Sequence, residues 1–375
     1  MIIAFLILAV LAVFCELYLS FIFIPSQYGL TYYVVRIKYA AYIYNGRTGY
    51  QYKPLLRRQS SMVLYKKAPR KIEFKNFRTN KQGFVGEDEM DTLKAKKLIF
   101  CIGGSTTAGA ESDYRKTYPA QLDTLVRPYN YRCVNAGLGG CRSIHELLTL
   151  RHRVLTYKPR AIILWSGYND YEAFSYKMSA PFDPFTHYLT SVLPRNKIEE
   201  TLCLSAAYFI FRKKLGLKTK IAATDVHCFQ ESLDNPQWLP EWKENVGKII
   251  ALCRQHTIPI FLVNTFTPAF AGASVDVKKQ ADNELAMSGC FDQSLQYAVL
   301  INQETRLIAT TLGATYIDVI PHFETYLSQF KKQDYVKQRL ALFIDRIHFT
   351  EYANEILSRA IFAGIQESMQ LKDIS

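Results

Sequence analysis

The chain has 375 residues, of which 49% are hydrophobic and 21% are charged, and its formal net charge is +13. This composition excludes an intrinsically disordered protein, and the length suffices for one large folded domain or two ordinary ones. The positive charge is concentrated in residues 36–97, which hold 16 Lys or Arg and 5 Asp or Glu and so carry +11 of the total. The rest of the chain is nearly neutral, which argues against a nucleic-acid partner.

Residues 1–24 are apolar except for Glu16 and a few small or hydroxylated side chains. At about 1.5 Å per residue, a helix of this length crosses a bilayer core of about 30 Å. We therefore predict a retained single-pass transmembrane anchor. A cleaved signal peptide is the alternative, but it requires a positively charged start, and residues 1–10 contain no Lys or Arg.

A basic, Tyr-rich segment, residues 25–96, follows the predicted anchor. Aromatic side chains favour the membrane interface and basic ones favour anionic headgroups, so we expect residues 36–97 to contact anionic lipids. A solvated, charged linker without a partner is the alternative. Arg36 and Lys38 follow the span and nothing basic precedes it, which leans towards a cytoplasmic domain, although long domains override that signal. The side of the membrane therefore stays open.

From Lys97 onward, short apolar runs alternate with stretches of helical periodicity, which is typical of repeated strand–helix units. Five runs are predicted strands: Leu98–Ile102, Tyr131–Val134, Ala161–Trp165, Ile258–Val263 and Ala314–Val319. The predicted helices are Tyr118–Val126, Ser143–Tyr157, Glu241–Gln255, Leu285–Leu312 and Glu351–Ile365. Because the strands are apolar throughout, helices should cover both faces of a five-stranded parallel sheet. We thus expect a three-layer α/β/α domain over residues 97–375, interrupted at about 172–240 by an insertion or lid, or by an irregular connection.

Polar residues follow the predicted strands at the sheet edge where open parallel sheets bind ligands. The first strand leads into Gly103-Gly104-Ser105, where a serine at a strand-to-helix turn lies beside backbone N–H groups that can stabilise an oxyanion. Such a serine needs a base to accept its proton. His348 is the candidate base, and Asp345, three residues earlier, can orient its imidazole. The sequence therefore predicts a catalytic triad of Ser105, His348 and Asp345.

The negative charge of a tetrahedral intermediate also needs hydrogen-bond donors. We expect these from the backbone N–H groups of Ser105 and Gly140 and from the side-chain amide of Asn169, which follow the first three strands. Asp170 is interpreted as a structural hydrogen-bonding residue that fixes its loop. Arg142, two residues after Gly140, is a candidate for favouring anionic substrates.

These blocks resemble, in their order, the SGNH hydrolases, also called GDSL-type lipases and esterases. The resemblance covers about residues 76–368, with Ser105, Gly140, Asn169 and His348 each in one of the four blocks. Residues 79–84, Thr-Asn-Lys-Gln-Gly-Phe, resemble the T-N-x-x-G-F-R-G lead-in of membrane-anchored members, with Val85 in place of Arg. The family's Gly-Asp-Ser reads Gly-Gly-Ser here, a change that keeps the nucleophile. The resemblance implies the flavodoxin-like fold of that superfamily and an acyl-enzyme mechanism.

Other kinds of site fit less well. The Gly-rich turn lacks the Gly-Lys-Ser/Thr of a phosphate-binding loop, and Thr107 stands where the nucleophile elbow of α/β-hydrolases has its last Gly. The remaining histidines lack metal-ligand spacing, so we expect neither a metal nor a cofactor. The sequence thus predicts a membrane-tethered serine esterase that acts on short acyl or acetyl esters of glycans or lipids. The alternatives are an O-acetyltransferase acting on a polysaccharide and a non-catalytic glycan-binding scaffold.

Overall fold

The computed structural model of the chain describes residues 10–15, 18, 41–61, 74–93, 96–175, 233–285, 287 and 289–371. These residues fall into two units, the first ending at Lys53 and the second beginning at Pro54. In the first unit, β1 (Tyr42–Asn45) pairs antiparallel with β2 (Gly49–Tyr52). Everything described after Lys53 belongs to the second unit, which carries the predicted site.

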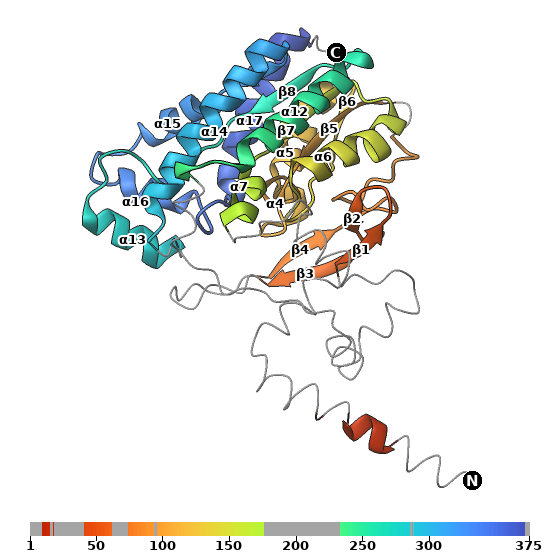
Figure 1. The fold of residues 1–375 in the computed structure, drawn as a ribbon, viewed down its shortest axis with the longest axis horizontal. Coiled ribbons are helices and arrows are strands. Elements are labelled where there is room, and N and C mark those ends of the chain that lie inside the picture. The colour runs from red at the N-terminus through yellow and green to blue at the C-terminus, as the bar shows by residue number, and fades with distance from the viewer. Residues whose placement is uncertain are drawn as a thin grey trace. The chain divides into compact units, whose positions relative to one another are not determined.

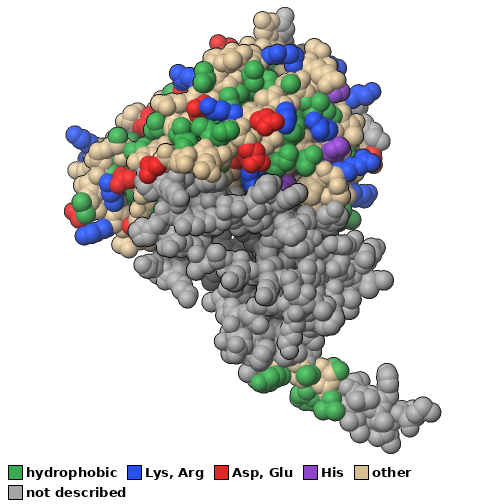
Figure 2. Space-filling model, viewed as in Figure 1, with side chains coloured by type: hydrophobic (Ala, Val, Ile, Leu, Met, Phe, Trp, Pro, Cys, Tyr) green, Lys and Arg blue, Asp and Glu red, His purple; other side chains and the backbone are tan. Residues whose placement is uncertain are grey.

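Most of the predicted anchor, residues 1–24, lies outside the described residues, as do residues 176–232 of the predicted insertion. Residues 10–15 and Tyr18 are helical and expose large apolar side chains, which form the green group near the bottom of Figure 2. Among the helices that the structure describes, none combines the length and apolar character that a membrane crossing requires.

A five-stranded parallel sheet forms the centre of the second unit, in the order β6-β5-β7-β8-β9 (Figure 1). The strands are β5 (Lys97–Gly103), β6 (Tyr131–Asn135), β7 (Ala161–Trp165), β8 (Ile260–Val263) and β9 (Thr315–Ile317). The predicted parallel sheet is confirmed, and its strand ends differ from the predicted ones by at most two residues. The strand order reverses between β5 and β7, and a reversal of this kind opens a crevice at the carboxyl ends of the two strands.

Both faces of the sheet are buried because alternate strand residues point to opposite sides. Phe100 and Ile162 join one hydrophobic cluster, and their neighbours Cys101 and Ile163 join the other. The first face is covered by α6 (Ser143–Thr149), α12 (Trp238–Gln255) and α14 (Phe291–Leu312), and the second by α5 (Tyr118–Val126), α15 (Ile320–Leu327) and α17 (Glu351–Met369). The second unit is therefore the three-layer α/β/α arrangement that the apolar strands indicate (Figure 1).

The helices depart from prediction in several places. The predicted helix Leu285–Leu312 starts later, as α14 at Phe291, because Gly289 has a φ of 78°, which an α-helix does not accommodate, and the helix before it, α13 (Val275–Leu285), was not predicted. The helix α6 continues into a π-helical turn and a 3₁₀ turn that ends at Tyr157. A short helix, α7 (Tyr168–Ser175), occupies the start of the predicted insertion, and α16 (Tyr335–Ala341) precedes the predicted triad loop.

The predicted lead-in segment packs against the sheet. It follows a hairpin of β3 (Arg57–Ser61) and β4 (Phe74–Arg78). The side chain of Asn80 accepts hydrogen bonds from the backbone of Gln82 and Phe84, each at 3.0 Å, and closes a tight turn. The backbone N–H of Val85 then donates to Asn135 at the end of β6 over 3.0 Å, and the Val85 side chain is buried. An apolar residue therefore suits the position at which the resembled motif has Arg.

Candidate active site

Ser105 lies directly after β5 and begins the short helix α4 (Ser105–Ala108). The turn before it is tight, since a Cβ at Gly103 would lie 2.5 Å from the carbonyl oxygen of Trp165 at the end of β7. This close approach needs glycine and brings Ser105 to the crevice between β5 and β7. Among the described residues, the Ser105 backbone N–H has no hydrogen-bond partner. It is free to donate to a ligand, as the predicted oxyanion hole requires.

The three residues of the predicted triad form a continuous chain of hydrogen bonds. His348 Nε2 lies 2.8 Å from Ser105 Oγ, and His348 Nδ1 lies 2.7 Å from Asp345 Oδ2. The other carboxylate oxygen of Asp345 accepts the backbone N–H groups of Ile347 at 2.9 Å and His348 at 2.8 Å. One side chain therefore fixes both the loop and the imidazole ring. This is the geometry in which a histidine can take a proton from a serine.

The loop that carries Asp345 and His348 is closed on itself. The backbone N–H of Ile344 donates to the carbonyl of His348 over 2.8 Å, and Phe343 pairs with Phe349 in an antiparallel bridge. The helix α17 starts immediately afterwards and is capped by the Thr350 side chain. His348 therefore belongs to a short, hydrogen-bonded loop that leads directly into the first turn of α17.

The charges around His348 favour its protonated form. Burial lowers the pKa of His348, but the negative charges of Asp345, Glu111 and Glu172 outweigh this effect and raise that pKa from 6.5 to about 9. Burial likewise raises the pKa of Asp345, but the charge and hydrogen bonds of His348 outweigh it and bring that pKa to about 2. The structure therefore favours an ion pair of imidazolium and carboxylate at neutral pH.

The second predicted oxyanion donor, Asn169, lies at the start of α7 beside the serine turn. Its Nδ2 donates to the carbonyl of Cys141 over 2.8 Å, which leaves the second amide hydrogen for a ligand. The Cys141 thiol in turn donates to the carbonyl of Gly103 over 3.2 Å, so the loops after β5, β6 and β7 are linked.

Gly140, the third predicted donor, lies in the same loop as Cys141 and has a φ of 73°, a left-handed conformation that favours glycine. It does not line the cavity beside Ser105 among the residues described. The structure thus brings Ser105 and Asn169 to one cavity, and Gly140 directly precedes Cys141, whose carbonyl holds the Asn169 amide.

A cavity opens beside Ser105 at the carboxyl ends of β5 and β7. Ser105, Asn169, Trp165 and Thr265 all line it. Its wall also contains Glu146, whose carboxylate accepts a hydrogen bond from Ser166, and burial raises the pKa of Glu146 well above 4.5. The cavity wall therefore combines apolar surface from side chains such as Trp165 with polar groups, among them a buried acid that favours its neutral form.

Asp170 and Arg142 lie behind the cavity. Both carboxylate oxygens of Asp170 accept hydrogen bonds from Ser143, the first residue of α6, and Asp170 is 1% exposed. This arrangement is the structural role interpreted from sequence. The guanidinium of Arg142 contacts Asp170 at 3.7 Å and Glu241 at 2.9 Å. Two carboxylates thus offset its charge, which does not support the predicted preference for anionic substrates.

A comparison with protein families identifies the family of this chain. The model of the GDSL-like lipase/acylhydrolase family matches residues 101–356 of the chain. The chain belongs to the GDSL-like lipase/acylhydrolase family. It is accordingly an ester-hydrolysing serine hydrolase. The matched range includes all three predicted triad residues of this GDSL-like hydrolase. No curated protein matches the chain.

Several solved structures match this GDSL-like hydrolase at low sequence identity. A catalytic mutant of the acetylxylan esterase Axe2 from Geobacillus stearothermophilus is 17% identical, with a TM-score of 0.40, and the match covers 72% of this chain and 96% of that one. The acetyl xylan esterase AlAXEase is 13% identical, with a TM-score of 0.41 and coverage of 72% and 99%. LAE5, an α/β hydrolase from the metagenome of Lake Arreo, Spain, is 16% identical, with a TM-score of 0.38 and coverage of 72% and 97%. Similarity at this level assigns no substrate.

The sequence did not predict two residues at this site of the GDSL-like hydrolase, Glu146 and Glu111. Glu146 lies within α6, where its spacing is that of an ordinary helix residue. Glu111 lies in the loop after α4, and its Oε1 is 3.7 Å from His348 Nε2. Neither belongs to a recognisable motif. The only signal for Glu111 is its position, six residues after the nucleophile on the same sheet edge.

Proposed function

We propose that the chain is a membrane-tethered serine esterase that cleaves short acyl esters, such as acetyl esters of glycans or lipids. In this mechanism Ser105 Oγ attacks the ester carbonyl while His348 Nε2 accepts its proton, and Asp345 stabilises the imidazolium. The backbone N–H groups of Ser105 and Gly140 and the side-chain amide of Asn169 donate to the oxyanion. The 2.8 Å contact between Ser105 Oγ and His348 Nε2 carries this proposal.

The preference for short acyl groups rests on the cavity wall. A long acyl chain needs a continuous apolar channel to offset the loss of its own hydration. In the cavity beside Ser105, the apolar part of the wall is instead interrupted by the polar side chains of Glu146, Ser166 and Thr265 among the residues described. We expect kcat/KM for p-nitrophenyl esters to be highest for acetate and to fall for butyrate and octanoate. A rise with chain length would contradict the short-acyl preference.

The membrane tether rests on the apolar sequence of residues 1–24 and on the exposed apolar side chains of the described residues 10–15 and 18. Flotation of the full chain with vesicles tests it. A variant with a polar linker in place of residues 1–24 serves as the control and should remain at the bottom of the gradient. Adding anionic lipid to the vesicles tests whether the basic segment contributes. Equal flotation of both proteins would remove the anchor from the proposal.

The nucleophile is tested with Ser105→Ala. We expect this variant to lose both p-nitrophenyl acetate hydrolysis and fluorophosphonate labelling, while its circular dichroism and melting temperature stay those of the parent protein. Thr106→Ala, one residue away, is the matched control and should keep its labelling. Labelling that persists in Ser105→Ala would move the nucleophile elsewhere.

A further inference from the structure

A second carboxylate faces the catalytic histidine. Glu111 Oε1 lies 3.7 Å from His348 Nε2, the same ring nitrogen that contacts Ser105 Oγ at 2.8 Å. The Glu111 side chain is 20% exposed, and its Oε2 is buried without a hydrogen-bond partner among the described residues. An ionised carboxylate offers about four acceptor positions, so Glu111 has acceptor capacity left unused beside the reacting nitrogen.

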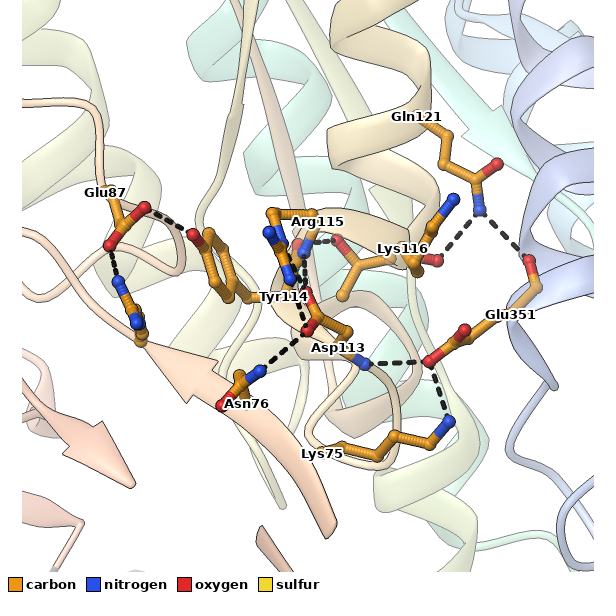
Figure 3. A network of polar contacts seen from close by, with 11 residues as sticks. Lys75, Asn76, Glu87, Asp113, Tyr114, Arg115, Lys116, Gln121 and Glu351 are labelled. Atoms are coloured by element: carbon orange, nitrogen blue, oxygen red, sulfur yellow. Dashed lines mark hydrogen bonds and ion pairs between the residues drawn. The ribbon is translucent and has the colours of Figure 1, made fainter. Parts of the chain in front are cut away.

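The loop that carries Glu111 is fixed to the catalytic loop by a network of polar contacts. Glu351, in the first turn of α17 after His348, accepts hydrogen bonds from Lys75 at 2.9 Å and from the backbone N–H of Asp113 at 3.2 Å (Figure 3). The Asp113 carboxylate accepts from Arg115 and from Asn76 in β4 (Figure 3). The network therefore ties the residues directly after Glu111 to both β4 and α17.

The position of Glu111 is also held from inside the fold. Ser112 is fully buried, and its hydroxyl accepts a hydrogen bond from Asn354 of α17 over 3.3 Å. Gly109 ends α4 in a left-handed conformation with a φ of 65°. A side chain there would strike Thr117, so the turn that leads to Glu111 has little freedom. A carboxylate held in this way is positioned in advance of the reaction.

The chemistry at Nε2 shows what such a carboxylate can do. In the second half of an acyl-enzyme reaction, a water attacks the ester carbonyl carbon and gives one proton to the histidine. The same water has a second hydrogen, which needs an acceptor. The carbonyl is occupied by the oxyanion donors Ser105 and Asn169, whereas Glu111 is beside the atom that takes the first proton.

We propose that Glu111 is a catalytic residue that accepts a hydrogen bond from the deacylating water and orients it between His348 Nε2 and the acyl-enzyme. This inference rests on the proposed acyl-enzyme at Ser105. All atoms and protons of this deacylation step are accounted for. The water oxygen bonds to the acyl carbon, one water proton goes to Nε2, and the second stays on the oxygen and points at Glu111. Collapse of the intermediate breaks the bond to Ser105 Oγ, which recovers the proton from Nε2, and releases the carboxylic acid.

The other carboxylates near His348 are not positioned to bind a water beside Nε2. Asp345 contacts the opposite ring nitrogen, Nδ1. Glu172 adds negative charge near His348, but its carboxylate forms an ion pair with Arg346. Among the carboxylates of the described chain, Glu111 and Asp345 are those within 4.0 Å of the imidazole nitrogens. Glu172 therefore provides the electrostatic control, because it affects the charge around His348 without contacting Nε2 in the described structure.

The test compares water with methanol as the attacking nucleophile in the full chain. Methanol has a single hydroxyl proton, which it gives to His348, so it gains nothing from Glu111. With p-nitrophenyl acetate, the p-nitrophenol burst reports acylation, steady-state kcat reports deacylation, and the ratio of methyl acetate to acetate reports the choice of nucleophile. Each variant is measured on the alkaline plateau of its own pH profile, because a change at Glu111 also alters the charge around His348.

In Glu111→Leu, which removes the acceptor, we expect the burst rate to stay within about threefold of the parent and deacylation by water to fall by roughly ten- to hundredfold. The product ratio should shift towards methyl acetate by a similar factor, and acetylated protein should accumulate in intact-mass spectra. Glu111→Asp keeps the charge but shortens the side chain, so it should keep the pH profile and still shift the product ratio. Glu172→Gln should change the pH profile and leave the product ratio unaltered.

The outcomes separate this inference from the function on which it depends. A parent protein that shows no burst and no fluorophosphonate labelling would overturn the esterase proposal itself. A parent with a normal burst, together with unchanged kcat and product ratio in both Glu111 variants, would overturn the role of Glu111. Loss of burst and deacylation to the same extent would also contradict it, because that result assigns Glu111 to the support of the triad.

Discussion

The side-chain amide of Asn169 occupies the space that a side chain at Gly104 would fill. A Cβ at Gly104 would overlap the Asn169 Nδ2 atom, although the backbone φ of Gly104, −77°, is one that any residue adopts. The glycine is therefore required by its neighbour rather than by its own backbone. The resembled Gly-Asp-Ser motif has a side chain at this position, whereas in this chain Gly104 leaves the space to the Asn169 amide.

This pairing predicts the effect of Gly104→Ala. The added methyl group should displace the Asn169 amide, and loss of one oxyanion donor should lower kcat by roughly a hundredfold or more. Gly247→Ala is the matched control, because a Cβ there lies 3.6 Å from its nearest neighbour, Leu312, in ordinary contact. The control should keep full activity. Gly104→Ala with parental kcat would show that Asn169 does not act as a donor.

The charges around His348 predict an alkaline activity profile. The base must be neutral to accept the serine proton, and the pKa of His348 is raised to about 9. Activity should therefore be low near pH 6 and rise towards about pH 9. The measurement is kcat/KM for p-nitrophenyl acetate against pH, with spontaneous hydrolysis subtracted. A plateau that is already reached below about pH 7 would contradict the ion pair.

Stability should change in the opposite direction over the same range. A group with a raised pKa stabilises the fold below its unfolded value, here 6.5, and this contribution is lost as the pH rises through about 9. The free energy of unfolding should fall by about 2–3 kcal/mol across this window. Urea titrations at several pH values measure it. His348→Gln lacks the titrating ring, so its unfolding free energy should depend much less on pH.

Asp345→Asn tests the orienting carboxylate. The amide cannot stabilise the imidazolium and selects the wrong tautomer, so kcat should fall by roughly 10³- to 10⁴-fold. The apparent pKa of His348 should also fall, since the negative charge beside it is gone. Asp276→Asn, at an exposed position on α13, is the control and should behave like the parent. A kcat within tenfold of the parent would transfer the orienting role to another group.

The network in Figure 3 predicts how far the lead-in supports the site. Glu351→Ala removes the acceptor for both Lys75 and the Asp113 backbone, so we expect a loss of about 1–2 kcal/mol in unfolding free energy. Lys75→Met removes only the partly exposed ion pair and should cost about 0.5 kcal/mol. Thermal or urea unfolding distinguishes the two. Equal losses in both variants would show that the bond to Asp113 contributes little.

The sheet and the triad could be predicted because their signals are local. Continuously apolar runs with clear ends define the strands, and Ser105, Asn169 and His348 each occupy a recognisable block. The start of α14 was predicted too early, although Gly289 marks it, because Leu285 and Met287 continue the apolar pattern on its N-terminal side. Glu111 could not be found, since its relation to His348 arises from the packing of α17 against loops more than 200 residues away.

The separation of the triad residues along the chain also determines when the enzyme can first act. Ser105 and His348 are separated by 243 positions in the chain yet share a hydrogen bond. The ribosome therefore completes the nucleophile, the oxyanion donors and all five strands of the sheet before the base exists. A nascent or prematurely terminated chain that lacks α17 contains an inert serine. Hydrolysis thus begins only after the last helix has docked, and activity reports complete synthesis of the hydrolase unit.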